Sequence, residues 1–196
     1  MKTKSKKQIF IGFILMSILI FLDQITKKLA VLYLKDQPAI PIIKEVFELK
    51  YLENTSAAFG MDPISFLHNI FEFKVFTQNP ELYLDVRMGF FYVLTIIIVC
   101  VFIWAYIKMP NIKRFVYLDW ILIFMSAGAI GNLIDRISQQ FVVDFLYFKL
   151  INFPIFNVAD IYVTCAAIAL FVLGIFYYKD EDVDMIFPSK KDKEKA

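Results

Sequence analysis

The chain contains 196 residues, of which 59% are hydrophobic and 17% aromatic, and its formal net charge is only +2. Soluble domains are about 45–50% apolar on a more inclusive count, so this composition, with a mean hydropathy of +0.62, indicates an integral membrane protein. The weak net charge suggests no nucleic-acid partner. A single histidine, His68, argues against a histidine-based metal cluster or a Ser/His/Asp triad. Cys100 and Cys165 lie in apolar stretches and are expected to be packing residues rather than a disulfide.

Four apolar stretches are long enough to cross the roughly 30 Å hydrocarbon core of a bilayer as helices. They cover approximately residues 9–34, 88–107, 115–135 and 156–178. The first follows a basic run, as a cleaved signal peptide would. No small-x-small cleavage site comes after it, and the apolar character resumes after Lys28. The sequence therefore predicts an all-α membrane protein with four transmembrane helices, the first of them retained.

The stretch between the first two predicted helices, residues 36–87, is too long for a simple connection. Residues 40–59 alternate loosely and contain several β-forming residues, which predicts a small antiparallel hairpin or sheet on the membrane surface. Residues 64–76 mix apolar and charged side chains, which favours an amphipathic interfacial helix or a mobile flap. This segment has four phenylalanines that either contact lipid tails and bound peptide or anchor it in the interface: Phe66, Phe71, Phe73 and Phe76.

Basic residues predict the orientation of the chain, because lysine and arginine are enriched in cytoplasmic loops. The amino-terminus holds four lysines and the 108–114 connection holds three basic residues, whereas the connection before the fourth helix holds only Arg136 and Lys149. Both termini are therefore expected in the cytoplasm. Residues 36–87 and the connection between the third and fourth helices are expected at the outer face.

Several polar side chains interrupt the apolar helices. Asp23 and Lys27 are spaced i, i+4 on the first helix, so they lie on one face and can pair. They form either a structural ion pair or a direct part of substrate handling. In the string GAIGNLIDR of the third helix, Asn132 shares a face with both Asp135 and Arg136. Asp135 is in principle either a catalytic acid or a residue that fixes the helix end.

Asp144 and Asp160 are the most informative residues, about sixteen positions apart in the strings FVVDF and FNVAD. A carboxylate at mid-bilayer costs about 2.5–3.5 kcal/mol on insertion scales, so two at one membrane edge suggest a function. A pair of carboxylates can share a proton and act as acid and base. Asn157 shares a face with Asp160, and a helix cap is an equally good reading of Asn157. Asp160 alone would also suit a helix amino-terminus.

Five strings occur in order along the chain: FLDQITKK, NTSAAFG, GAIGNLIDR, FVVDF and FNVAD. Together they resemble the motifs of the lipoprotein signal peptidases of bacteria, the type II signal peptidases. The resemblance covers about residues 20–165 and implies a four-helix aspartyl protease whose catalytic pair matches Asp144 and Asp160. It implies supporting roles for seven further polar residues: Asp23, Lys27, Asn54, Asn132, Asp135, Arg136 and Asn157.

The chain departs from the family pattern at four positions, none of them a proposed catalytic group. Ala127 replaces the first of two glycines, and Ser56 and Gln140 stand where glycine is common. Phe153 stands where tryptophan is frequent before the proline of the last motif. The outer segment around residues 70–84 is also longer than usual. These departures affect the expected docking of lipid and peptide rather than the expected chemistry.

The resemblance implies cleavage of signal peptides from prolipoproteins, just before a cysteine that already carries a diacylglyceryl group. The expected partners are these lipid-modified precursors and membrane lipids, with no cofactor, no metal and no nucleic acid, and the enzyme is expected to act as a monomer. Residues 1–180 are predicted to form one peptidase domain in the cytoplasmic membrane, followed by a charged cytoplasmic tail, residues 181–196. The alternatives are a small transporter, which would need a polar path to the inner face, and a catalytically silent chaperone for lipoprotein precursors.

Overall fold

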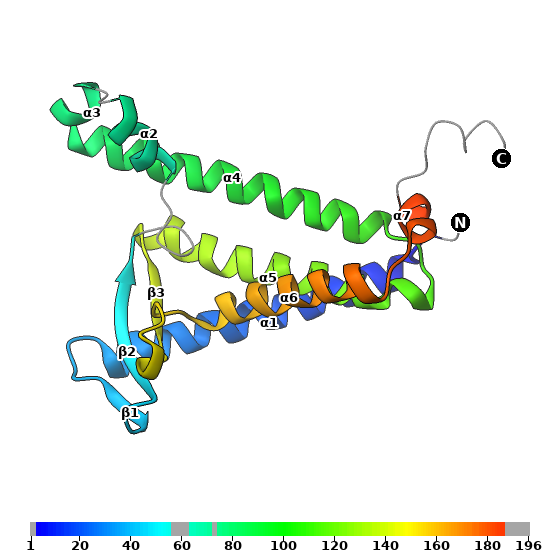
Figure 1. Cartoon of the computed structure of the whole chain (residues 1–196), viewed down its shortest axis with the longest axis horizontal. Coiled ribbons are helices and arrows are strands. Elements are labelled where there is room, and N and C mark those ends of the chain that lie inside the picture. Colours follow the sequence, from blue (N-terminus) through cyan, green and yellow to red (C-terminus); the bar gives the residue numbers. More distant parts are fainter. Residues whose placement is uncertain (1–2, 56–62, 72–73, 187–196) are drawn as a thin grey trace.

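A computed structural model describes residues 3–55, 63–71 and 74–186 of the chain. Within these ranges four helices are long and apolar enough to span a membrane: α1 (Lys6–Leu34), α4 (Pro80–Lys108), α5 (Val116–Gln139) and α6 (Val158–Phe176). Figure 1 shows these helices running lengthwise, with the β-strands at one end and the beginning of α1 at the other. The predicted four-helix membrane fold is confirmed.

The beginning of α4 differs from the prediction, because the helix starts at Pro80 rather than near residue 88. Proline suits the first turn of a helix, where its missing N–H would have no partner. Glu81, Asp85 and Arg87 are compatible with a helix in water but not in hydrocarbon. Hydropathy therefore locates the part of α4 that lies in lipid and misses its outward extension. The other three helices match their predicted bounds to within about a turn.

The third spanning helix, α5, contacts α1, α4 and α6. Gly128 lies against the backbone of Ala159 on α6, and Gly131 lies against the carboxylate of Asp23 on α1, so a β-carbon at either glycine would overlap its neighbour. Glycines at these two positions therefore allow α5 to approach α6 and α1 closely. Ala127 is fully buried in the cluster around Met16, so this departure from the family pattern is accommodated within a packed core.

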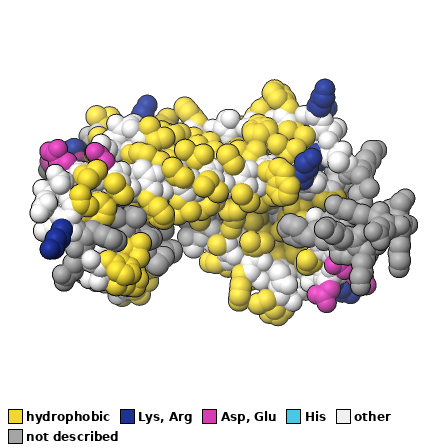
Figure 2. Space-filling view, turned by 90° about the horizontal axis from the view of Figure 1, so that it is seen from above, with side chains coloured by type: hydrophobic (Ala, Val, Ile, Leu, Met, Phe, Trp, Pro, Cys, Tyr) yellow, Lys and Arg dark blue, Asp and Glu magenta, His cyan; other side chains and the backbone are white. Residues whose placement is uncertain are grey.

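The outward surface of the helices is apolar and needs lipid to cover it. Figure 2 shows hydrophobic side chains covering most of the length of one face. In the most apolar window of α5 only 39% of residues are buried, and the share is 17% or less in α1, α4 and α6. Cys100 and Cys165 are both free, as predicted, but both are exposed on these helices, so the prediction that they are packing residues is wrong.

A small antiparallel sheet lies at one end of the helices. Its strands are β1 (Ile40–Ile43), β2 (Phe47–Asn54) and β3 (Val142–Tyr147), in the spatial order β1-β2-β3. The predicted hairpin corresponds to β1 and β2. The sequence predicts only a connection before α6, whereas the structure contains the strand β3 there. β3 pairs with β2 so that Leu52 lies opposite Asp144, which brings the FVVDF string beside the hairpin.

The turn between α5 and β3 shows why glycine is common at position 140 in the family, where this chain has glutamine. Gln140 caps α5 in the left-handed conformation, with φ of 66°, and its N–H bonds to the carbonyl of Arg136. An L-residue with a side chain pays about 1–2 kcal/mol for this conformation, which glycine adopts freely. A glycine is therefore the natural residue at position 140. Ser56, another departure, lies outside the described residues.

Two short helices, α2 (Pro63–Phe71) and α3 (Lys74–Gln78), lie beside the outward extension of α4. The predicted helix over residues 64–76 is therefore present as two pieces, and residues 72–73 lie outside the described part of the chain. Phe66 and Phe71 are well exposed. The ring of Phe76 instead packs edge-on against His68 and Tyr83. The fourth phenylalanine, Phe73, is not among the described residues.

The opposite end of the bundle is held by ion pairs. Lys4 is buried, donates to the carbonyls of Tyr106 and Met109 at 2.8 and 3.1 Å, and pairs with Asp119 at 2.8 Å. These carbonyls end α4, where a cation also complements the helix dipole. Part of the predicted charged tail forms helix α7 (Asp180–Ile186), and its Asp182 pairs with Arg114. Two 3-10 turns, η2 (Lys113–Phe115) and η3 (Lys149–Ile151), complete the described elements.

Candidate active site

The strand β3 carries Asp144 into the interior. Val142, Val143 and Phe145 are buried around it, and Asp144 itself is only 1% exposed. β-Branched and aromatic residues favour a strand, and burial on both faces forces the carboxylate into an apolar setting. Asn54, at the end of β2, donates its side-chain N–H to Asp144 Oδ2 at 2.8 Å. The predicted site residue Asn54 is thereby placed against the proposed catalytic carboxylate.

Asp160 lies in the first turn of α6, where Asn157 is the N-cap. The Asn157 side chain accepts from the N–H of Asp160, and Asp160 Oδ2 accepts the N–H of Asn157, so the two residues form a capping box. The predicted capping role of Asn157 is confirmed. Its amide group has a further partner, because Nδ2 donates to Asp144 Oδ1 at 2.6 Å. Asn157 therefore starts the helix and contacts the second carboxylate at the same time.

Asn132 completes a bridge between the two aspartates. Its Nδ2 donates to Asp160 Oδ1 at 2.8 Å, and its Oδ1 accepts from Asn157 Nδ2 at 3.1 Å. A continuous chain of hydrogen bonds thus runs from Asp160 through Asn132 and Asn157 to Asp144. Side chains from α5, α6 and β3, far apart in the sequence, are held in one network. Such a network limits the positions that the two carboxylates can adopt relative to each other.

Lys27 is the buried cation behind this network. It is 3% exposed and contacts Asp23 Oδ2 at 2.9 Å, Asp135 Oδ2 at 3.1 Å and Asn132 Oδ1 at 2.8 Å. The predicted Asp23–Lys27 pair is present and extends to the third helix. A buried charge without such partners would be strongly destabilising. Lys27 therefore links α1 to α5 directly and contacts the asparagine bridge.

The two carboxylates paired with Lys27 also fix the backbone beside the proposed catalytic residues. Asp23 Oδ1 accepts the N–H of Ala159 at 2.9 Å, and Asp135 Oδ2 accepts the N–H of Val143 at 3.1 Å. Ala159 immediately precedes Asp160, and Val143 immediately precedes Asp144. Asp23 and Asp135 thus each hold, by a hydrogen bond, the backbone of the residue that precedes one of the two proposed catalytic aspartates. These contacts favour the structural reading of Asp23, Lys27 and Asp135 over direct contact with a reacting group.

Arg136, which directly follows Asp135, lies beside the helix α4. Its guanidinium carbon lies 5.9 Å from the ring centroid of Phe91 on α4. Its positive charge acts on the carboxylates of Asp160 and Asp144 as well as Asp135. Arg136 therefore belongs to the electrostatic surroundings of the aspartate pair, with an aromatic ring from α4 beside it.

Gln24 is a site residue that the sequence analysis missed. Its Nε2 donates to Asp23 Oδ2, to Asp135 Oδ1 and to the carbonyl of Gly131, at 2.9–3.2 Å. It stands directly after Asp23 in the FLDQITKK string, and an amide inside an apolar helix was an available signal. Gln24 joins the two supporting carboxylates and adds a second tie between α1 and α5.

Burial sets the protonation behaviour of Asp144. Burial raises the pKa of its carboxyl to about 7, and the negative charge of Asp160 acts in the same direction. The amide donors Asn54 and Asn157 oppose the rise, because hydrogen bonds to a carboxylate favour its charged form. Asp144 can therefore hold a proton near neutral pH, which an ordinary aspartic acid cannot.

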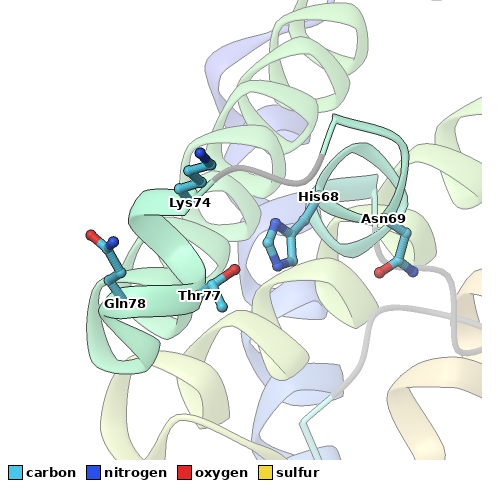
Figure 3. A pocket seen from close by; sticks show the side chains of 5 residues that line it. All are labelled: His68, Asn69, Lys74, Thr77 and Gln78. Carbon is cyan, nitrogen blue, oxygen red and sulfur yellow. The ribbon is translucent and has the colours of Figure 1, made fainter.

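Other features of the described residues lie apart from this cluster. A hollow of about 380 Å³ lies between α2 and α3 and is lined by His68, Asn69, Lys74, Thr77 and Gln78 (Figure 3). None of the predicted site residues lines it. In the described ranges, no group of three or more His, Cys, Asp or Glu side chains is arranged to hold a metal ion. The aspartate pair with its asparagine bridge remains the site with the clearest chemistry.

The sequence is similar to those of known proteins of one family. The sequence profile of the Signal peptidase (SPase) II family matches residues 15–176. A lipoprotein signal peptidase of Caldanaerobacter subterraneus subsp. tengcongensis is 39% identical over 164 residues, which is 83% of this chain and 94% of that protein. One from Enterococcus faecalis is 34% identical over 160 residues, covering 82% and 84%.

The fold also resembles solved structures of bacterial membrane enzymes. One, determined by the in meso method at 1.9 Å, aligns with a TM-score of 0.66 and 24% identity, covering 91% of this chain and 99% of that one. Another, at 2.3 Å, aligns with a TM-score of 0.65 and 22% identity, covering 97% of both chains. The arrangement of helices and sheet is therefore one that membrane enzymes adopt.

Proposed function

The chain belongs to the signal peptidase II family, and from this premise we propose that it is an aspartyl endopeptidase of the bacterial cytoplasmic membrane. It removes signal peptides from prolipoproteins that carry a diacylglyceryl group, cleaving before the modified cysteine. Residues 1–180 form its peptidase domain, and it acts as a monomer. The observation that carries the proposal is the pair of buried aspartates, Asp144 and Asp160, joined through Asn132 and Asn157.

The surroundings of the two aspartates suggest different roles for them. The raised pKa of Asp144 suits a general acid that is protonated near pH 7. Asp160 accepts hydrogen bonds from the Asn157 N–H and from Asn132, and it lies at a helix amino-terminus, where a negative charge is stabilised. Asp160 is also less deeply buried than Asp144, so water can reach it. We assign Asp160 as the general base and Asp144 as the general acid.

The reaction follows from these roles. Asp160 takes a proton from a water molecule as that water attacks the scissile carbonyl carbon. Asp144 donates its proton to the carbonyl oxygen, which gives a tetrahedral diol. Collapse of the diol breaks the C–N bond, and a proton passes to the leaving amine. The peptide bond is replaced by a carboxyl group and an amine, no covalent enzyme intermediate forms, and neither metal nor cofactor takes part.

A cleavage assay with a purified lipidated precursor tests this function. The signal peptide and the mature lipoprotein separate on a gel, and cleavage should occur before the modified cysteine. Cleavage is expected to continue in excess EDTA, because the two carboxylates act by proton transfer. An activity that is lost on chelation and restored by a divalent ion would contradict this mechanism, and absence of cleavage would contradict the function.

The active site is proposed to face the outer side of the membrane. The sheet, which carries Asp144 on β3, lies at the end of the helices opposite the amino-terminus and α7 (Figure 1). Because basic residues gather at the latter end, it is assigned to the cytoplasm. Reporter fusions near Asn54 and Tyr147 should give an outside signal, and fusions at both termini should give an inside signal. A cytoplasmic signal at Tyr147 would contradict the proposed topology, because it would place the active site at the inner side of the membrane.

The pH dependence of cleavage should report Asp144. Since the general acid must carry a proton and its pKa is about 7, kcat/KM is expected to fall above roughly pH 7. The Asn54 amide N–H stabilises the Asp144 carboxylate, so replacing Asn54 with alanine should raise the pKa of Asp144 further. The alkaline decline should then move to higher pH in the Asn54→Ala variant.

The matched control for this shift is Asn152→Ala. Asn152 is an exposed asparagine of the same outer region, and it accepts from the hydroxyl of Tyr147 rather than contacting an aspartate. Its pH profile should equal that of the wild type. An alkaline decline that stays in place or moves to lower pH in Asn54→Ala would remove Asp144 from the role of general acid.

A further inference from the structure

The outer half of α4 contacts the surroundings of the aspartate pair at three points. Arg87 Nη2 donates to the carbonyl of Thr55 at 2.6 Å, in the residue that follows Asn54. One turn later, Phe91 lies beside the guanidinium of Arg136, and the Tyr92 hydroxyl donates to the Arg136 carbonyl at 2.8 Å. Consecutive residues of α4 therefore hold both the side chain and the backbone of Arg136.

The burial of Phe91 distinguishes it from its neighbours. Phe91 is 6% exposed, whereas Phe90 is 37% and Val93 is 59% exposed on the same helix. Burying this ring against a guanidinium restricts the positions that Arg136 can adopt and adds cation–π attraction. The Tyr92 hydroxyl acts at the last turn of α5, where the Arg136 carbonyl also accepts the N–H of Gln140. This turn leads directly into β3 and Asp144.

From these contacts we infer that Phe91 and Tyr92 are positioning residues for Arg136 in the cleavage reaction. The inference rests on the proposed function. The charge of Arg136 acts on both Asp160 and Asp144, and its side chain and backbone are held by Phe91 and Tyr92; in the inferred role, this fixed cation counters the negative charge that develops at the aspartate pair during the reaction. A cation fixed in advance at such a place stabilises the transition state more than the bound substrate. Phe91 touches no reacting atom and acts only through Arg136.

The test compares variants of neighbouring residues in the same cleavage assay. Phe91→Leu should lower kcat about tenfold with little change in KM, because it removes the aromatic face and keeps an apolar side chain. Phe91→Tyr should restore most of the rate, and Tyr92→Phe should lower kcat about threefold. Phe90→Leu is the matched control: Phe90 is 37% exposed and packs edge-on against Phe91, so the same substitution there leaves the Phe91 ring beside Arg136, and kcat should stay close to that of the wild type.

Two further measurements separate positioning from a general loss of packing. Val99→Ala removes buried volume from α4 at a site away from Arg136, and it should lower the unfolding temperature without lowering kcat. In isotope-labelled protein, the Nε–H resonance of Arg136, assigned by its loss in Arg136→Lys, should move in Phe91→Leu and stay in place in Phe90→Leu.

The outcomes distinguish this inference from the proposed function. Absence of cleavage by the wild-type protein would overturn the function, and the inference with it. A wild type that cleaves, with Phe91→Leu matching Phe90→Leu in kcat or in the Arg136 resonance, would overturn the inference alone. If kcat of Phe91→Tyr were as low as that of Phe91→Leu, the loss of the aromatic face would be excluded as the cause of the lower kcat.

Discussion

Replacing either Asp144 or Asp160 with asparagine is expected to abolish useful cleavage while leaving a folded, membrane-inserted protein. Asparagine has nearly the same shape as aspartate but cannot exchange the proton that the reaction requires. General acid–base groups contribute about 10²–10⁴-fold to rate, so kcat should fall on the order of 10³-fold in each variant. The measurement is turnover of a lipidated precursor by purified protein in detergent, together with a size determination that should show a monomer.

Glu45→Gln provides the matched control for these variants. It makes the same chemical change at a carboxylate between β1 and β2 that is 69% exposed and pairs with Lys149 rather than with a site residue. Its turnover should equal that of the wild type. Near-normal turnover by Asp144→Asn or Asp160→Asn would remove that aspartate from the proposed chemistry.

The stability of Asp144→Asn should confirm that its loss of activity is not caused by unfolding. Because folding raises the pKa of Asp144 from 3.8 to about 7, the folded protein binds more protons than the unfolded chain between these values. This group therefore lowers the free energy of unfolding as pH rises from about 4 to about 7. The neutral asparagine lacks this effect, so the variant should unfold at the same or a higher temperature than the wild type at pH 8. A marked drop would indicate a structural role instead.

A precursor without its diacylglyceryl group is expected to be cleaved much more slowly than the modified form. The aspartate pair lies at one end of the spanning helices, and the outer segment beside α4 exposes Phe66, Ile70 and Phe71. Contacts with remote acyl chains can orient a scissile bond, and their loss lowers the rate of the chemical step. Since each buried methylene contributes about 0.8 kcal/mol, the difference in kcat/KM should be on the order of 10²-fold or more.

The comparison uses one precursor with and without its lipid, under identical detergent conditions. Double replacement of Phe66 and Phe71 with serine then tests where the lipid is recognised. If these side chains contact acyl chains or close over the peptide, the variant should lose rate only with the lipidated precursor. An equal loss with both precursors would assign the two phenylalanines to anchoring the segment in the interface. Equal kcat/KM for the two precursors with the wild-type enzyme would exclude lipid recognition from its specificity.

Local patterns predicted most of the elements because each depends on neighbouring residues. Length and hydropathy located α1, α5 and α6 to within about a turn, since a bilayer sets the length of an apolar helix. The capping role of Asn157 followed from its place just before the fourth helix. The outward extension of α4 was missed because hydropathy detects lipid contact rather than helix. The strand β3 was missed because its stability depends on pairing with β2, ninety residues away at Asn54 and Asp144.

The sequence by itself determined that this is a four-helix membrane protein and singled out Asp144 and Asp160 as a possible acid–base pair. The residues alone left open whether the Asp23–Lys27 pair is structural or handles substrate, and whether Asp135 is a catalytic acid or fixes a helix end. Only the tertiary structure showed that Asp23 and Asp135 accept the N–H groups of Ala159 and Val143. It also showed that Gln24 contacts Asp135 and that Phe91 and Tyr92 contact Arg136. The reason is physical: the residue type of a charged or aromatic side chain does not say which distant residue it will contact. Those contacts form only when the helices pack against one another, which Gly128 and Gly131 allow by close approach.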